Sequence, residues 1–106
     1  MSSQAVQTRE RVHPAHALAH HREAVKELVR QHQGTDVWVF GSVARGEATH
    51  DSDIDLLVDF TDDVTLHDEA VLHQRLEELL GVSVDLIGVE DVDEHGGSIA
   101  RDAKWL

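Results

Sequence analysis

The sequence predicts a small domain of the α/β (α+β) class, in which helices cover a mixed β-sheet. Three observations support this class. The chain has 106 residues, which is the size of one compact domain. Apolar residues make up 41% of the chain, which is enough to build a core. Helix-like and strand-like segments follow one another in the order helix, strand, strand, helix, strand, helix.

The first predicted helix spans residues 14–32 and follows a polar segment, residues 1–12, which we expect to be a flexible N-terminal arm. Pro14 suits the first turn of a helix, and Gly34 lies just beyond its end. We expect residues 13–106 to form a single domain. The helix has one stripe of apolar side chains at helical spacing, formed by Leu18, Val25, Leu28 and Val29.

Three segments rich in β-branched and apolar residues predict the strands of the sheet: residues 36–40, 53–60 and 82–87. The first strand runs into Gly41, where we expect a turn. A short helix is expected directly after this turn, over residues 43–47. The chain therefore changes direction at the end of the first strand, before the second strand begins.

Two further helices complete the predicted fold. Thr65 and Asp68 form a capping box that predicts a helix over residues 65–80, and Gly81 ends it. A short helix from Ser98 is expected to close the chain, after a break at two consecutive glycines.

Composition excludes several functions. The formal net charge is −12, which opposes sequence-independent binding to nucleic acid, because such binding depends on Lys and Arg. The chain has no cysteine, which excludes disulfides and agrees with a cytoplasmic location. Its apolar runs are shorter than a membrane span, and its first residues lack the hydrophobic block of a secretory signal. We therefore expect a cytoplasmic protein that binds neither nucleic acid nor membrane directly.

Two carboxylates, Asp53 and Asp55, stand one residue apart at the start of the second strand. Because side chains alternate along a strand, both point to one face while Ile54 and Leu56 point to the other. The same alternation places Asp85 on the less apolar face of the third strand. If these strands are neighbours, the three acids share a surface. Converging carboxylates provide the oxygen ligands that Mg²⁺ prefers.

The Gly41–Ser42 turn is the expected phosphate site. Gly41 allows a phosphate to approach the backbone, while the Ser42 hydroxyl and the turn amides can donate hydrogen bonds to it. Arg45 either adds positive charge at a triphosphate or forms an ion pair with an acid of this segment. Two metal ions about 3.5–4 Å apart can bind both the attacking and the leaving oxygen of a phosphoryl transfer. Asp85 is the candidate to hold the metal on the nucleophile side and to help remove its proton.

The run Gly41–Phe60, "GSVARGEATHDSDIDLLVDF", resembles the signature of the DNA polymerase β-type nucleotidyltransferase superfamily. In that signature a Gly-Ser pair is followed after ten residues by Asp-x-Asp, and later by a third acid on a strand. Within the superfamily, the run and the later "VSVDLI" are similar to the minimal nucleotidyltransferases, which include MNT-type antitoxins. The similarity covers residues 36–87, about half of the chain.

The resemblance implies a nucleotidyltransferase fold and an enzyme that transfers a nucleoside monophosphate, most often AMP from ATP, and releases pyrophosphate. It implies that Gly41 and Ser42 bind the triphosphate, with Arg45 assigned to the same nucleotide site. It also implies that two Mg²⁺ ions are held by the three acids Asp53, Asp55 and Asp85. The implied partner is a HEPN-type toxin, a helical RNase that the small enzyme adenylylates and so neutralises.

Two other functions stay open: a non-catalytic antitoxin that masks its partner by binding, and a nucleotidyltransferase subunit that acts on a small molecule. Trp38 is interpreted as core or helix packing rather than as a platform for a base. Trp105 either anchors the C-terminus or lies in an interface, and with Ile99 and Leu106 it is compatible with docking onto another chain.

The nine histidines are interpreted separately. Those of the first helix, at helical spacing, lack a matching carboxylate or Cys set and are interpreted as a solvated helix face: His13, His16 and His20. His50 lies within the motif loop and is interpreted as an exposed loop residue.

Overall fold

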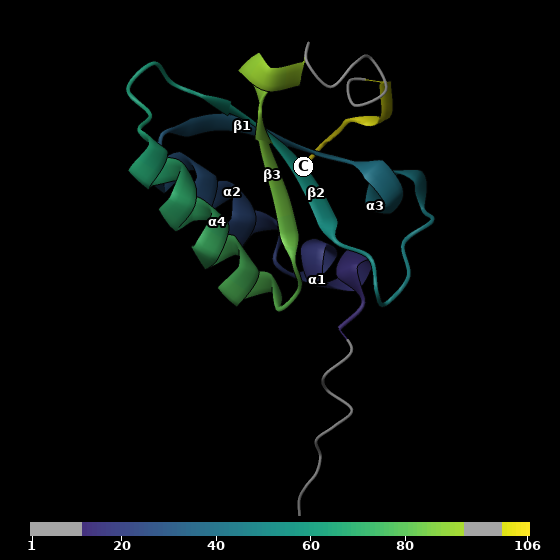
Figure 1. The fold of residues 1–106 in the computed structure, drawn as a ribbon. Coiled ribbons are helices and arrows are strands. Elements are labelled where there is room, and N and C mark those ends of the chain that lie inside the picture. Colours follow the sequence, from purple (N-terminus) through teal and green to yellow (C-terminus); the bar gives the residue numbers. More distant parts are fainter. Residues whose placement is uncertain (1–11, 93–100) are drawn as a thin grey trace, which may run out of the picture.

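The structure is a computed structural model that describes residues 12–92 and 101–106 (Figure 1). Within these residues, four strands form one sheet in the order β3-β2-β1-β4. β2 is antiparallel to β1 and parallel to β3, and β4 is antiparallel to β1. The sheet is therefore mixed, as predicted. The strands are β1 (Gly34–Phe40), β2 (Ile54–Phe60), β3 (Val84–Gly88) and β4 (Lys104–Trp105).

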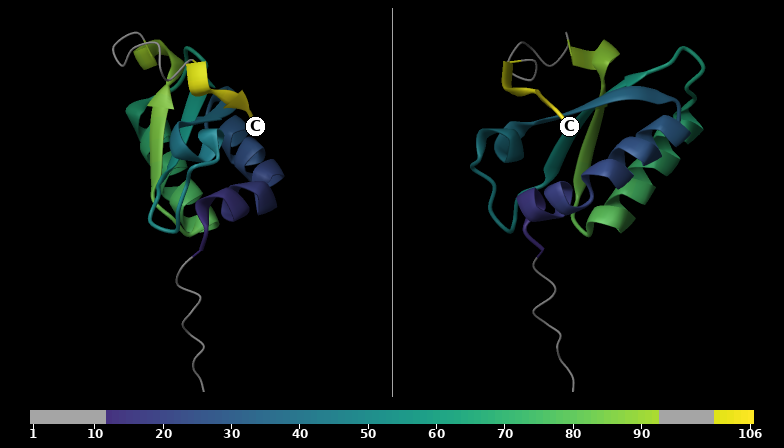
Figure 2. Two further views of the ribbon diagram at one scale, coloured as in Figure 1. Left: turned by 90° about the vertical axis from the view of Figure 1, so that its right-hand side faces the viewer. Right: turned by 180° about the vertical axis from the view of Figure 1, so that it is seen from behind.

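The helices α2 and α4 lie side by side along one face of the sheet, and the short helix α3 lies apart from them (Figures 1 and 2). A 3₁₀ turn, η3 (Val89–Asp91), follows β3. Within the part of the chain that the structure describes, no helix combines the length and the apolar character that a membrane crossing requires. The helices are α1 (Pro14–His20), α2 (Arg22–Gln31), α3 (Gly41–Arg45) and α4 (Leu66–Leu80).

The hydrophobic core lies between the sheet and the helices α1, α2 and α4. Alternate residues of β2 supply its centre, since Ile54, Leu56 and Val58 are fully buried. α2 and α4 contribute the facing side chains, among them Val25 and Leu76. The predicted alternation of β2 is thus confirmed, and its consequence is that Asp55 belongs to the opposite face of the sheet.

The single helix predicted over residues 14–32 is wrong, because the chain forms two helices that meet at His21. His21 departs from helical geometry, with φ −105° and ψ 19°. The hydrogen bonds on either side persist: its N–H donates to the Ala17 oxygen and its own oxygen accepts from the Val25 N–H. The change of direction at this residue allows Leu18 of α1 and Val25 of α2 to enter the same core.

The C-terminal strand β4 was not predicted. Trp105 pairs with Trp38 of β1, and the Leu106 N–H donates to the Val37 oxygen at 3.1 Å. The Leu106 oxygen accepts a further hydrogen bond from Arg22 Nε at 2.6 Å. These contacts join the end of the chain to β1 and α2, and they leave the Leu106 side chain buried.

The remaining boundaries follow the predictions closely. The capping box of α4 is confirmed by two 3.0 Å hydrogen bonds, from the Asp68 N–H to the Thr65 hydroxyl and from the Thr65 N–H to the Asp68 carboxylate. Gly81 ends α4 with a positive φ of 74°. The helix expected from Ser98 begins outside the described residues.

Candidate active site

The parallel pairing of β2 with β3 places Asp55 directly opposite Asp85 in register. Asp53 lies immediately before β2, where the Ile54 N–H donates to the Ser83 oxygen at 3.0 Å. Asp53 and Asp85 are exposed, whereas Asp55 is half-buried. The two strands are neighbours, which is the condition under which the three acids were expected to share a surface. The three acids therefore gather at one end of the sheet, on the face opposite α2 and α4.

The carboxylates act on one another electrostatically. Burial raises the pKa of Asp55 above its ordinary value, and the negative charges of Asp85 and Asp53 raise it further. The positive charge of Arg45 acts in the opposite direction but does not cancel the rise. Ionised Asp55 is therefore destabilised in the folded chain, so a cation bound between these acids would relieve the repulsion.

Gly41 holds the turn after β1 against Asp55. Phe40 is the register partner of Asp55, so the next residue reaches the same end of the sheet. Gly41 has a φ of +70°, which L side chains rarely adopt, and a Cβ at this position would overlap the Asp55 carboxylate. A glycine is required here for both reasons. The missing side chain lets the Asp55 carboxylate lie directly against the backbone of the turn.

Ser42 lies in the first turn of α3, which starts two residues before the predicted segment 43–47. The helix ends at Gly46, whose φ of 74° is left-handed. The backbone carbonyl oxygen of Ser42 accepts a 2.9 Å hydrogen bond from the Glu47 N–H. α3 is thus a single tight turn that places Gly41 and Ser42 at the end of β1, next to the acids.

Arg45 forms the ion pair that the sequence left open as one of two roles. Its Nε donates to Glu47 at 2.9 Å, and its Nη1 donates to Asp102 at 2.9 Å. The hydrogen bond to Glu47, followed by that to Asp102, raises the pKa of Arg45. Glu47 is an acid of the same segment, as this role required, whereas Asp102 is distant in sequence and was not predicted. The positive charge of Arg45 also opposes the rise in the pKa of Asp55, so Arg45 still contributes to the electrostatics of the site.

The acids do not form a ready-made metal cage. Among residues 12–92 and 101–106, no three His, Asp or Glu side chains are arranged to hold a metal ion by themselves. Mg²⁺ usually keeps several waters and is bound by one or two carboxylates together with substrate phosphates. The three acids supply carboxylate oxygens, and Asp55 is repelled by its two neighbours. Such a group can bind a metal ion that is also held by substrate phosphates. The residues present therefore fit Mg²⁺ that arrives with a nucleotide.

The histidines contact one another. His13 caps α1 by accepting a hydrogen bond from the Ala15 N–H at 3.1 Å, and its ring lies 5.2 Å from that of His16. His50, from the loop before Asp53, lies 5.0 Å from His13. His16 and His50 are exposed, as predicted, whereas His13 is half-buried.

Trp38 does not enter the core, contrary to the interpretation made from the sequence. Its neighbours Val37 and Val39 belong to the core, so alternation turns Trp38 toward the other face of the sheet. There it is the register partner of Leu57 and contacts Trp105, with ring centroids 4.5 Å apart. A strand with apolar residues on both faces gives no alternation from which the sequence could have shown this.

Comparison with known proteins identifies the class. The chain belongs to the nucleotidyltransferase domain family, whose model matches residues 18–104. It is similar to a minimal nucleotidyltransferase of solved structure, with 45% identity and a TM-score of 0.77 over 87% of this chain and 95% of that one. The predicted minimal nucleotidyltransferase and its fold class are thereby confirmed.

Two further comparisons are with a curated relative and with a solved structure of the same fold. The protein adenylyltransferase MntA of Thermococcus cleftensis is 47% identical over 62 residues, which are 58% of this chain and 63% of that protein. The match thus spans less than two thirds of the relative's length. The MNT antitoxin solved with the tri-AMPylated HEPN toxin of Shewanella oneidensis has a TM-score of 0.63 at 20% identity, over 82% of this chain and 69% of that one. The last comparison shows a shared fold.

Proposed function

We propose that this protein transfers AMP from ATP to a hydroxyl group of a protein acceptor in a Mg²⁺-dependent reaction, and that the acceptor is a HEPN-type toxin which it neutralises. The observation that carries the proposal is the pairing of Asp55 with Asp85 beside Asp53, directly against the Gly41 turn. The T. cleftensis relative is a protein adenylyltransferase, which supports AMP as the transferred group. The MNT antitoxin of the same fold, bound to an AMPylated HEPN toxin, supports the partner.

The roles of the residues follow from their positions. Gly41 and Ser42 bind the triphosphate, because the turn brings its backbone close to Asp55 without an intervening Cβ. Asp53 and Asp55 would hold Mg²⁺ together with the phosphate oxygens. Bound Mg²⁺ would supply positive charge at the transferring phosphoryl group.

Asp85 is placed to act on the acceptor. Its carboxylate is exposed and lies beside Asp55 on the open face of the sheet, where a hydroxyl group of another molecule can reach it. In the proposed reaction the acceptor oxygen forms a bond to the α-phosphorus, the bond from that phosphorus to the bridging oxygen breaks, and pyrophosphate leaves. Asp85 helps to remove the hydroxyl proton as the new bond forms.

Charge-neutral substitution of the acids tests this function. The variant carrying Asp53→Asn and Asp55→Asn is incubated with ATP labelled at the α-phosphate and with a HEPN-type toxin as the acceptor. We expect label transfer to fall by at least about a hundredfold, because the ligands of the metal are lost. The matched control carries Asp62→Asn and Asp63→Asn, two exposed acids in the turn after β2, and should transfer label like the unmodified chain.

The same pair of variants separates catalysis from masking. If the toxin is neutralised by AMP transfer, the Asp53→Asn, Asp55→Asn variant fails to restore growth of cells that produce the toxin. Full neutralisation by this variant, without label transfer, would instead identify an antitoxin that acts by occupying its partner's surface.

A further inference from the structure

An exposed tryptophan stands on a well-anchored strand. Trp105 is 67% exposed, although it is large and apolar. Its neighbour Leu106 is buried and is hydrogen-bonded to both Val37 and Arg22. Trp105 is therefore held outward by a fixed backbone, and its ring contacts the half-buried ring of Trp38 at 4.5 Å between centroids. The folded chain itself leaves most of this side chain in water.

The two tryptophans lie on the same face of the sheet as the acids. On β1 and β2, Phe40 pairs with Asp55, and the next pair on that face is Trp38 with Leu57. Successive residues on one face of a strand are about 7 Å apart. The surface formed by the exposed Trp105 and the half-buried Trp38 and Ile87, with Leu57 buried between the last two, is here called the tryptophan patch. It begins one residue pair away from the carboxylates, while α2 and α4 pack on the other face.

The surroundings of the tryptophan patch are acidic. Asp55 and Asp85 lie at one end of its strands, and Asp36 and Asp59 form a register pair at the other. A groove beside Trp105 is also lined by two cations of α2, Lys26 and Arg30.

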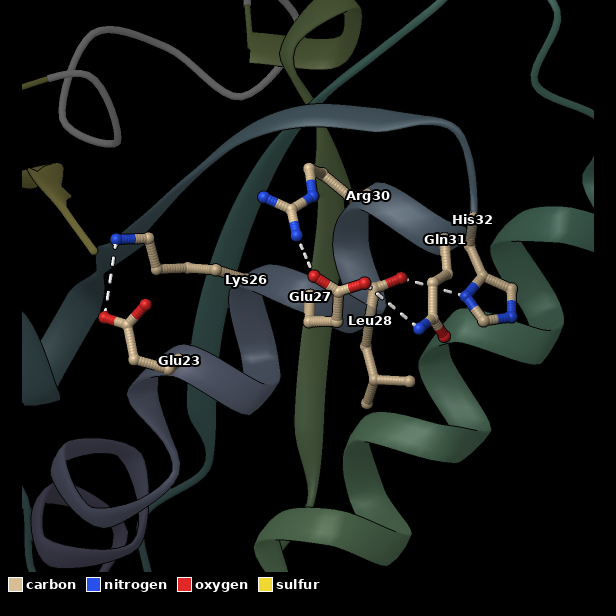
Figure 3. Close-up of polar contacts among 7 residues, drawn as sticks. All are labelled: Glu23, Lys26, Glu27, Leu28, Arg30, Gln31 and His32. Carbon is tan, nitrogen blue, oxygen red and sulfur yellow. Dashed lines mark hydrogen bonds and ion pairs between the residues drawn. The ribbon is translucent and has the colours of Figure 1, made fainter.

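These two cations are already paired within their own helix. Lys26 Nζ lies 3.7 Å from Glu23, and Arg30 forms an ion pair with Glu27, as Figure 3 shows. They therefore pair with acids of α2 rather than with the acids beside the patch, of which Asp55 is only partly compensated, by Arg45. A binding surface that complements the patch therefore has an apolar centre and a rim of Lys or Arg.

We propose that the tryptophan patch is the docking surface for the protein acceptor, whose matching surface is apolar and ringed by basic residues. This proposal rests on the proposed function in taking the acceptor to be a protein. Tryptophan is enriched among the residues that dominate binding energy, and such residues lie near the centre of an interface. A protein interface buries about 800 Å² on each side, whereas one aromatic side chain buries about 150–250 Å². The patch is thus the centre of the contact, and the acids are its rim.

The position of the patch links docking to chemistry. An acceptor bound over Trp105 and Trp38 lies against the same open face as Asp85, so that its hydroxyl group is brought to the candidate site. Binding through surface remote from the reacting atoms converts an encounter of two proteins into a positioned reaction.

Truncation of the exposed ring tests the proposal. Trp105→Ala is compared with Leu66→Ala, which removes an apolar side chain that is 85% exposed at the start of α4. Binding of a HEPN-type toxin is measured by calorimetry. We expect Trp105→Ala to weaken binding at least about tenfold and Trp105→Phe to retain most of it, while Leu66→Ala binds like the unmodified chain. The KM for ATP should stay unchanged in all three variants.

Two other results would overturn the docking proposal. Equal binding by Trp105→Ala and the unmodified chain overturns the proposal. A raised KM for ATP with unchanged acceptor binding also overturns it, and identifies the tryptophan as a nucleobase contact. Binding is repeated with the Asp53→Asn, Asp55→Asn variant, because docking does not require catalysis. A binding loss in Trp105→Ala without any AMP transfer by the unmodified chain would sustain the docking surface and reject the proposed enzyme.

Discussion

Arg45 Nη1 lies 2.9 Å from Asp102 Oδ2, an ion pair between residues 57 positions apart. It joins α3, which begins with the Gly41 turn, to the C-terminal segment that ends in β4. Arg45 also donates to Glu47, and its charge opposes the rise in the pKa of Asp55. One guanidinium thus connects the candidate site to the end of the chain.

The Arg45–Asp102 pair should contribute little to stability, because both side chains are partly exposed and water screens their attraction. We expect Asp102→Asn to leave the urea midpoint of unfolding nearly unchanged. A double-mutant cycle of Asp102→Asn with Arg45→Gln should give a small coupling that disappears at high salt. A large coupling that persists in about 1 M NaCl would contradict this expectation.

Gly41→Ala should be more harmful than Gly46→Ala, although both glycines have a positive φ. Gly46 has no atom near the position of a Cβ, so alanine there should cost about 1–2 kcal/mol for the left-handed conformation alone. At Gly41 the added Cβ also overlaps Asp55 and forces that carboxylate to move. Urea unfolding should show a larger loss of unfolding free energy for Gly41→Ala than for Gly46→Ala. AMP transfer should also fall further in Gly41→Ala than in Gly46→Ala. Equal losses of unfolding free energy in the two variants would show that the overlap with Asp55 has no effect on stability.

Asp55→Asn should stabilise the fold at neutral pH. Burial, together with the charges of Asp85 and Asp53, raises the pKa of Asp55 in the folded chain above its ordinary value of 3.8. Protonated Asp55 therefore favours folding: its contribution is fully present below the ordinary pKa and is lost as pH rises through the folded pKa. Asparagine resembles the protonated form at every pH.

The Tm of Asp55→Asn should exceed that of the unmodified chain at about pH 7, and the difference should vanish toward about pH 3. Thermal unfolding followed by circular dichroism over this range measures it. Asp62→Asn, which changes an exposed acid, is the control and should shift Tm little. A lower Tm for Asp55→Asn at neutral pH would contradict the prediction.

Two leucines of α4 should differ sharply in their effect on stability. Leu76 is fully buried in the core, whereas Leu66 is 85% exposed. Leu76→Ala should lower the free energy of unfolding by about 2–5 kcal/mol through lost burial and the cavity left behind. Leu66→Ala should change it by no more than about 0.5 kcal/mol. Chemical denaturation of both variants measures the two changes. Similar losses of unfolding free energy would contradict the assignment of Leu76 to the core and of Leu66 to the surface.

Most of the fold could be predicted from local patterns. The capping box at Thr65 marks the start of α4, and the alternation around Ile54 separates a buried face of β2 from an acidic one. The break at His21 could not be predicted, because the apolar stripe of the first segment continues through it. β4 has two residues, too few for any periodicity, and it depends on hydrogen bonds to β1.

The candidate site was predicted as a set of residues but not as an arrangement. The spacing of Asp53 and Asp55 is a property of one strand, and their common side of the sheet follows from it. Their association with Asp85 depends on which strands are neighbours. The ion pair of Arg45 with Asp102 depends on the path of the C-terminal segment.

The sequence by itself determined most of the helices and strands, which side of β2 is buried, and which acids are available for chemistry, because these follow from patterns within a dozen residues. The tertiary structure alone decided that Asp85 meets Asp55, that Gly41 lies against the same carboxylate, and that Trp38 turns outward to Trp105. These contacts join residues far apart in the chain, and the order of strands that creates them is selected by packing of the whole core rather than by any local preference.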